Sequence, residues 1–285
     1  MGALLTTFPI AALVAEAGYQ QALSRYGVIF VAVGVLAAQG LRPADPESRI
    51  DSQSQSQSRT PNPESRTQFH PSAMLRTPIF WLMFVMMTMM STAGLMVTSQ
   101  MAAFTRDFGM ANAVVFGLPL LPLALSLDRV TNGLTRPFFG WLSDQIGREN
   151  TMVIAFALEG VAMTLWLFTR AHPALFVVMS GVVLFGWGEI FSLFPSTLTD
   201  TYGTRHATTN YGFLYMAQGV GSVLGGPVAA LLHDAYGSWM PVFAIVIAMN
   251  FATAFLAGVV LKPMRQRWLV DRVSVRAAAP AIPVR

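Results

Sequence analysis

Residues 140–148, Gly-Trp-Leu-Ser-Asp-Gln-Ile-Gly-Arg, form a short polar turn between two long apolar runs. Gly140 is small enough to let a neighbouring helix approach, and Gly147 lets the chain reverse direction. Asp144 is placed to meet a cation or the N-terminus of a helix at this turn. Nine residues alone are equally compatible with an ordinary tight loop that carries a charge pair. The position of the loop in the chain therefore has to decide between these interpretations.

The composition of the whole chain is typical of a membrane protein. Of its 285 residues, 54% are hydrophobic and 11% are charged, whereas soluble domains are about 25% charged. The chain has no Cys, and its four His lie in loops or at predicted helix ends without paired spacing, so we expect no metal site. It contains no nucleotide-binding motif and no catalytic motif, so we expect no cofactor and no enzymatic activity.

Apolar runs of about 20 residues, each long enough to cross a bilayer, recur along the chain. They predict membrane-spanning helices over residues 2–17, 24–41, 78–104, 112–142, 150–169, 174–198, 208–232 and 238–261. The stretch between the second and third runs contains Ser-Gln-Ser-Gln-Ser-Gln-Ser at 52–58 and almost no apolar residues. Such a segment cannot bury a core, so we interpret it as a linker.

These runs divide the chain into four predicted parts and set its expected topology. The predicted parts are residues 1–41 with the last helices of an incomplete first bundle, the linker 42–77, a complete six-helix bundle 78–262 and a basic tail 263–285. Arginines concentrate in the linker, in the loops at Arg148 and Arg205 and in the tail. The positive-inside rule places all four on the cytoplasmic side. The same distribution makes the arginines a topology signal, and we expect no nucleic-acid partner.

Six spans after a long cytoplasmic linker, with the loop 140–148 between the second and third of them, resemble the second half of a major facilitator superfamily transporter. The loop is similar to that superfamily's G-x-x-x-D-x-x-G-R loop, with Gly140, Asp144, Gly147 and Arg148 in its fixed positions. The resemblance implies an all-α membrane fold and a cytoplasmic gate at this loop. Basic family residues are replaced here by Gln145 and Glu149, so the charge network of the gate is expected to be weaker or different.

Further stretches narrow the resemblance to the oxalate:formate antiporter family. Those stretches are Thr131–Gly140, Gly186–Phe191, Thr209–Gly219 and Gly2–Pro9, which look like that family's eighth, tenth, eleventh and fifth helices. This implies that about four and a half helices of the carrier are missing from the N-terminal side, in a fragment or a truncated gene. We expect those missing helices and the lipid bilayer to be partners of the chain, with the bacterial inner membrane as its location.

Charged residues within predicted spans are functional candidates by default, because inserting them in a membrane is costly. They are Asp128, Arg129, Arg136, Glu159 and Glu189. Arg129, Asn132 and Arg136 share one helical face. Arg136 is suited to grip a carboxylate through two parallel hydrogen bonds, and the resemblance assigns it the binding of the anionic substrate. Pairing of Arg129 with Asp128, and of Arg136 with Glu189 or Glu159, stays open as an alternative.

Two more helices carry candidate cavity residues. In 208–232, one helical face is polar and contains Tyr211, Tyr215, Gln218 and Ser222. An adjoining face is a stripe of small residues suited to close helix packing or sliding, namely Ala217, Gly221, Gly225 and Ala229. In 174–198, Trp187, Phe191 and Phe194 share a face, and the resemblance aligns Trp187 and Phe191 with cavity-lining residues. Static packing is the alternative for both groups.

Gln218 departs from the resemblance, because the matching position in the well-described oxalate:formate antiporters is a lysine. A second cation for a dianion is therefore absent. This puts oxalate in doubt as the substrate, whereas a carboxylate of some kind is still expected. We interpret the chain as part of a secondary transporter of small organic carboxylate anions such as oxalate, formate or related monocarboxylates. The substrate-binding residues would be Arg136, Gln218, Tyr215, Trp187 and Phe191. The alternative is a truncated, non-transporting membrane remnant or a partner-binding half of such a carrier.

Overall fold

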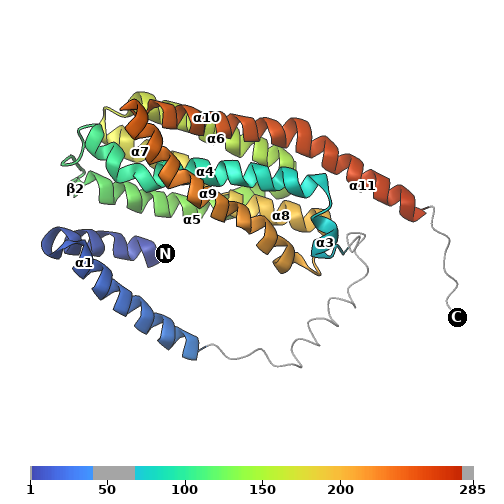
Figure 1. Ribbon diagram of the computed structural model, residues 1–285, viewed down its shortest axis with the longest axis horizontal. Helices are drawn as coiled ribbons and strands as arrows, with labels where there is room; N and C mark the ends of the chain where they lie inside the picture. The colour runs from blue at the N-terminus through green and yellow to red at the C-terminus, as the bar shows by residue number, and fades with distance from the viewer. Residues whose placement is uncertain (1, 41–67, 278–285) are drawn as a thin grey trace. The chain divides into compact units, whose positions relative to one another are not determined.

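The computed structural model describes residues 2–40 and 68–277, which form two separate parts (Figure 1). The first part is helix α1, Gly2–Gln39. Its residue Gly18 has non-helical dihedral angles, φ 80° and ψ 164°, so the element consists of two helices joined at a kink. This break falls between the predicted runs 2–17 and 24–41. Residues 42–67 of the predicted linker lie outside the described residues, whereas residues 68–77 are described and include the short helix α3, Pro71–Met74, whose Met74 is buried.

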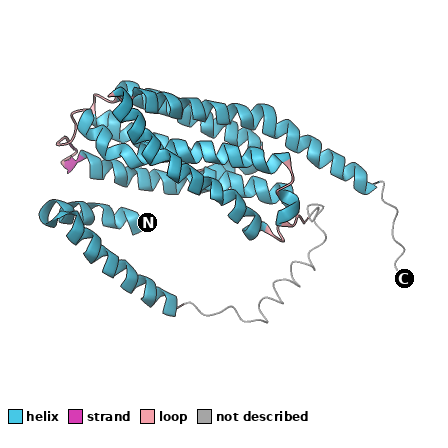
Figure 2. Ribbon diagram, viewed as in Figure 1, coloured by secondary structure: helices cyan, strands magenta, loops and turns pink. Residues whose placement is uncertain are grey.

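The second part is a bundle of helices with one minimal hairpin (Figure 2). Its elements are α3 Pro71–Met74, α4 Pro78–Asp107, β1 Val114–Val115, β2 Leu118–Pro119, α5 Leu120–Ile146, α6 Arg148–Thr169, α7 Pro173–Trp187, α8 Ile190–Tyr202, α9 Ala207–Tyr236, α10 Met240–Phe255, the π-helix η1 Leu256–Leu261 and α11 Lys262–Ala277. With α7 and α8 as one pass and α10 to α11 as another, the chain passes along the bundle as the six predicted spans. This is an all-α membrane fold.

Six helices within the described ranges are long and apolar enough to cross a membrane. One lies in residues 6–39, and the other five are 78–107, 148–169, 173–202, 207–236 and 240–270. Helix α5 is the exception among the predicted spans. It has 27 residues, but four of them are charged, namely Asp128, Arg129, Arg136 and Asp144. The least apolar pass is therefore the one that carries the predicted substrate cation.

Helices α4 and α9 pack closely, and so do α5 with α7 and α6 with α10. The small-residue stripe of α9 forms the contact with α4. A Cβ on Gly221 would lie 2.6 Å from Ser91 Cβ, and one on Gly225 would lie 2.9 Å from Leu95 Cβ. The stripe residues Ala217 and Ala229 are fully buried. The predicted close packing of this face is confirmed.

Buried apolar side chains form two clusters, one toward each end of the bundle. The first contains Phe104, Trp166 and Phe243 and reaches the hairpin, whereas the second contains Phe139, Phe156 and Phe194 and reaches α3. Trp187 packs against both clusters, so it lies at the middle of the bundle. Phe194 is fully buried and stacks on Phe156 at 6.1 Å, as the packing alternative for this aromatic face predicted, whereas Trp187 and Phe191 are only partly buried.

Two predicted spans differ in their boundaries. Residues 112–119 lie outside the helix, with the hairpin at 114–119, and α5 begins only at Leu120. Phe116 and Gly117 both have positive φ, 51° and 77°, which is the conformation of a tight two-residue hairpin turn. The span 174–198 is broken after Trp187, because the glycine-rich sequence Gly186–Gly188 favours helix weakly and the hydrogen bond from Phe191 N to Gly188 O tightens the chain there.

The end of the bundle opposite the hairpin gathers the segments that were predicted to share one side of the membrane. Phe69 N donates to Tyr202 O at 2.9 Å, and Arg205 N donates to Gln68 Oε1 at 2.6 Å. The chain that leaves the linker therefore lies beside the loop at Arg205. The turn at Gly147 and the start of α11 lie at the same end, as the contacts of Arg148 and Arg265 described below demonstrate.

Candidate functional site

The site is built around α5. Arg129 and Arg136 are exposed on this helix, and Asn132 between them is partly exposed. Arg136 precedes Asp144 by eight residues, which at about 1.5 Å per residue places it about 12 Å deeper along the helix. No carboxylate of the described residues lies within ion-pair distance of Arg129 or Arg136. The alternative pairings of Arg129 with Asp128, and of Arg136 with a buried glutamate, are thus not observed.

Arg136 lies over an aromatic surface. Its guanidinium carbon is 5.0 Å from the centroid of the Phe191 ring, a cation–π arrangement that leaves the edge of the guanidinium free to donate hydrogen bonds. Phe191 contacts the Trp187 ring edge-on at 5.7 Å and the Tyr215 ring at 6.2 Å. Tyr215 in turn contacts Tyr211 at 5.5 Å. The structure thus brings together four of the five predicted substrate-binding residues, namely Arg136, Phe191, Trp187 and Tyr215.

Two close helix approaches position this aromatic surface. A Cβ on Gly188 would lie 2.1 Å from Thr135 Cγ2, so the break between α7 and α8 packs directly against α5, one residue from Arg136. A Cβ on Gly94 would lie 2.1 Å from Trp187 Nε1, which donates to Met90 O at 2.9 Å. Helix α4 therefore fixes Trp187 through a hydrogen bond and a steric fit.

Gln218, the fifth predicted residue, joins the others only through the polar face of α9. It follows Tyr215 by one turn, and its Oε1 is buried without a hydrogen-bond partner among the described residues. The amide therefore keeps an acceptor to satisfy, which is the opposite of what a lysine would supply here. Within the described residues the side chain forms no bond to Arg136.

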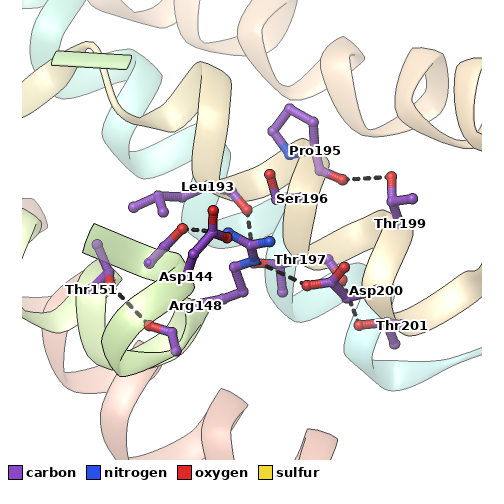
Figure 3. Close-up of polar contacts among 12 residues, drawn as sticks. Asp144, Arg148, Thr151, Leu193, Pro195, Ser196, Thr197, Thr199, Asp200 and Thr201 are labelled. Carbon is purple, nitrogen blue, oxygen red and sulfur yellow. Dashed lines mark hydrogen bonds and ion pairs between the residues drawn. The ribbon is translucent and has the colours of Figure 1, made fainter. Parts of the chain in front are cut away.

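The loop 140–148 belongs to a charge network at the end of the bundle (Figure 3). Arg148 pairs with Asp144 at 2.7 Å and with Asp200 at 3.0 Å, and also donates to the Ser143 hydroxyl. Gly147 has φ 90°, so the predicted turn is confirmed. A Cβ on Gly140 would meet no atom of the described residues within 4 Å, so the expected helix approach there is wrong for this part of the chain.

The network continues into α11. Arg265 pairs with Glu149 at 2.6 Å, donates to Thr201 Oγ1 at 2.8 Å and lies 3.9 Å from Asp200. Glu149, which stands where the family has a basic residue, thus acquires its cation from a distant helix. The network differs from the expected one and is not weak. Sequence reasoning missed Asp200 and Arg265, and the only available signal was their position at helix ends on the side of the loop.

Three carboxyl groups are buried inside the bundle. Glu159 on α6 and Glu189 before α8 are fully buried, and Asp128 on α5 is 5% exposed. None of their six carboxyl oxygens has a hydrogen-bond partner within the described residues that meets strict geometry. In the same residues no group of three or more His, Asp and Glu is arranged to hold a metal ion.

Comparison with known proteins identifies the family to which the chain belongs. A family model described as Major Facilitator Superfamily matches residues 121–280. The oxalate:formate antiporter of Oxalobacter formigenes is 32% identical over 197 residues, which cover 69% of this chain and 46% of that protein. An uncharacterized MFS-type transporter of Escherichia coli, YhjX, is 27% identical over 52% of this chain and 36% of its own length. Monocarboxylate transporter 13 of Rattus norvegicus is 26% identical over 46% of this chain and 32% of its own length. The chain spans less than half the length of each of these relatives.

Proposed function

Since this chain belongs to the major facilitator superfamily, we propose that it forms the substrate-binding second half of a transporter for small organic carboxylate anions. Membership of the superfamily makes it an integral, multi-pass membrane transport protein. The carboxylate class is supported by the similarity to an oxalate:formate antiporter and to a monocarboxylate transporter. Formate, oxalate and related monocarboxylates are the candidate substrates.

The observation that carries the proposal is the unpaired Arg136. A guanidinium inside a membrane helix requires a counter-charge, and no described carboxylate lies within ion-pair distance of this one. The Phe191 ring covers one of its faces at 5.0 Å and leaves the edge of the guanidinium free to bind a ligand. The planar group can donate two parallel hydrogen bonds to a carboxylate. Trp187 and Tyr215 form the walls, and Gln218 orients the bound anion.

The charge balance favours monoanions over dianions. One cation neutralises a monocarboxylate, whereas a dianion with one cation keeps an unpaired charge that costs several kcal/mol on the order given for buried ions. Gln218 contributes a dipole where a lysine would contribute charge. Arg129 lies on the same helix face and is exposed, so it is the residue that would supply a second charge if a dianion proved to be the substrate.

The charge network at one end of the bundle has a role in the proposed transport cycle. The carrier exposes a midplane site alternately to the two sides by rocking one helix bundle against the other. The network of Asp144, Arg148, Asp200, Arg265 and Glu149 holds α5, α6, α8 and α11 together at one end and would move as a unit in such a step. We propose that this end and the linker are cytoplasmic, that the membrane is the bacterial inner membrane, and that further N-terminal helices of the same carrier complete the cavity.

The test is uptake by the full-length carrier reconstituted in proteoliposomes. Radiolabelled formate, acetate and oxalate are offered alongside a sugar and an amine of similar size. We expect saturable uptake or counterflow of the carboxylates alone, with a monocarboxylate preferred. Uptake of the amine or sugar in preference to every carboxylate would overturn the proposal.

A further inference from the structure

Two buried carboxyl groups that the substrate site does not use lie near each other inside the bundle. Glu159 lies in the middle of α6, and Glu189 directly precedes α8. A Cβ on Gly186 would lie 2.9 Å from Glu159 Cβ and 3.3 Å from its Cγ, so the Glu159 side chain crosses α7 at Gly186. Gly188 and Glu189 keep right-handed helical dihedral angles, which puts Glu189 one turn beyond Gly186 on the same face. The two carboxyl groups are close enough to interact electrostatically.

A third buried polar group faces the pair from α10. The Asn250 side chain is fully buried and lies beside the Glu159 carboxyl. Its Nδ2 donates to Val246 O at 3.0 Å, whereas its Oδ1 has no hydrogen-bond partner among the described residues. The four oxygens of the two glutamates and the Asn250 Oδ1 are thus all buried without a hydrogen-bond partner among the described residues. A proton on one of the carboxyl groups would give these oxygens a hydrogen to share.

No cation of the described chain supplies that charge. Helices α7 and α10 and the π-helix η1 contain no ionisable side chain. On α4 the charges Arg106 and Asp107 are at the hairpin end, and on α8 the ionisable residues Asp200 and Tyr202 are at the opposite end. On α5, Asp128 is directed toward Ser180 of α7, and the two arginines lie on the exposed face. Two adjacent carboxylates without a cation repel each other, and one proton shared between them removes that repulsion.

We propose that Glu159 and Glu189 form a proton-binding site and that the carrier couples proton movement to anion movement through it. A proton adds to a carboxylate oxygen of one glutamate, which becomes a carboxylic acid and donates its O–H to the carboxylate of the other. Release reverses the step, and no other bond forms or breaks. The Asn250 Oδ1 is a second acceptor for the same proton.

The site is connected to the substrate residues through the helix break. Glu189 lies between Trp187 and Phe191 in the sequence, and the centroid of the Phe191 ring is 5.0 Å from the guanidinium carbon of Arg136. A change of charge at Glu189 therefore acts on the segment that sets the position of Phe191 beneath Arg136. The coupling to anion movement depends on the proposed transport function, whereas the binding of a proton does not.

The proton site is tested without transport, by infrared spectroscopy of the purified chain in lipid at neutral and at high pH. We expect the carbonyl stretch of a protonated carboxyl at neutral pH in the wild type. Because either glutamate alone is still buried without a cation, the band should shift or lose intensity in Glu159→Gln, in Glu189→Gln and in Glu159→Asp, and the contribution of the pair should be lost only in the double variant Glu159→Gln/Glu189→Gln. The band should be unchanged in the control Asp234→Asn, whose side chain is 80% exposed. A band that persists unchanged in both glutamine variants would overturn the proposal, and so would one that sodium ions abolish at constant pH, which would indicate a sodium site.

Coupling is tested in the full-length carrier. An inward proton gradient should stimulate uptake of the transported anion in the wild type, and both Glu159→Gln and Glu189→Gln should abolish the stimulation. Gradient stimulation that survives in both Glu159→Gln and Glu189→Gln would contradict coupling at this pair. If no carboxylate is transported at all, the proposed function fails, and the infrared result still decides whether the pair binds a proton.

Discussion

Arg265→Met tests the charge network at the end of the bundle. The Arg265–Glu149 ion pair is 2.6 Å long, and its side chains are only 11% and 12% exposed. Removing one partner of a buried pair costs about 3–5 kcal/mol, because the other charge stays buried. Glu149 lies in the first turn of α6, where the helix dipole offsets up to about 1 kcal/mol of this cost. We therefore expect the free energy of unfolding to fall by about 2–4 kcal/mol.

The assay is reversible unfolding of the purified chain in mixed micelles, followed by circular dichroism. Lys262→Met is the matched control, because Lys262 precedes Arg265 by three residues and makes one exposed hydrogen bond, to Asn150 Oδ1 at 2.8 Å. Its loss should cost less than about 1 kcal/mol. Adding Glu149→Gln to Arg265→Met should recover part of the loss, since no unpaired charge then remains. Equal costs for Arg265→Met and Lys262→Met would refute the reasoning.

Three further predictions concern the site and the topology. Gly94→Ala should cost about 1–3 kcal/mol of stability by overpacking and change the fluorescence of Trp187, and unchanged emission would contradict the steric fit described above. Gln218→Lys should raise the affinity of the full-length carrier for oxalate relative to formate in competition uptake, and an unaltered order would exclude Gln218 from setting charge preference. In the cysteine-free chain, a cysteine at Thr204 should react with an impermeant maleimide only from the cytoplasmic side and one at Ala171 only from outside, and the reverse labelling would contradict the assigned orientation.

The sequence predicted those features that arise from local pattern. Stretches of apolar residues located the helices, and the four-residue spacing from Ala217 to Ala229 identified the face of α9 that packs on α4. The motif around Gly147 gave the turn between α5 and α6. In each case the signal and the structural feature lie within one or two adjacent elements, so short-range physical rules are sufficient.

Features that depend on distant residues could not be predicted in the same way. Arg265 contacts Glu149 across 116 positions of the chain, and nothing in either segment names the other as partner. The hairpin at 114–119 appeared as part of an apolar run, because its turn depends on backbone angles that apolar composition does not reveal. The proximity of Glu159 to Glu189 likewise required the packing of α6 on α7 at Gly186.

The role of Arg136 is tested most directly by equilibrium binding of radiolabelled formate to the purified full-length carrier. Each hydrogen bond from a charged group contributes about 1.5–3 kcal/mol, so the loss of two in Arg136→Gln should weaken binding by about 100-fold or more. Arg170→Gln is the control, because Arg170 lies 5.7 Å from the Phe108 ring in the same kind of contact but outside the site. We expect Arg170→Gln to bind formate as the wild type does. Wild-type affinity in Arg136→Gln would contradict the assignment of Arg136 as the anion-binding cation.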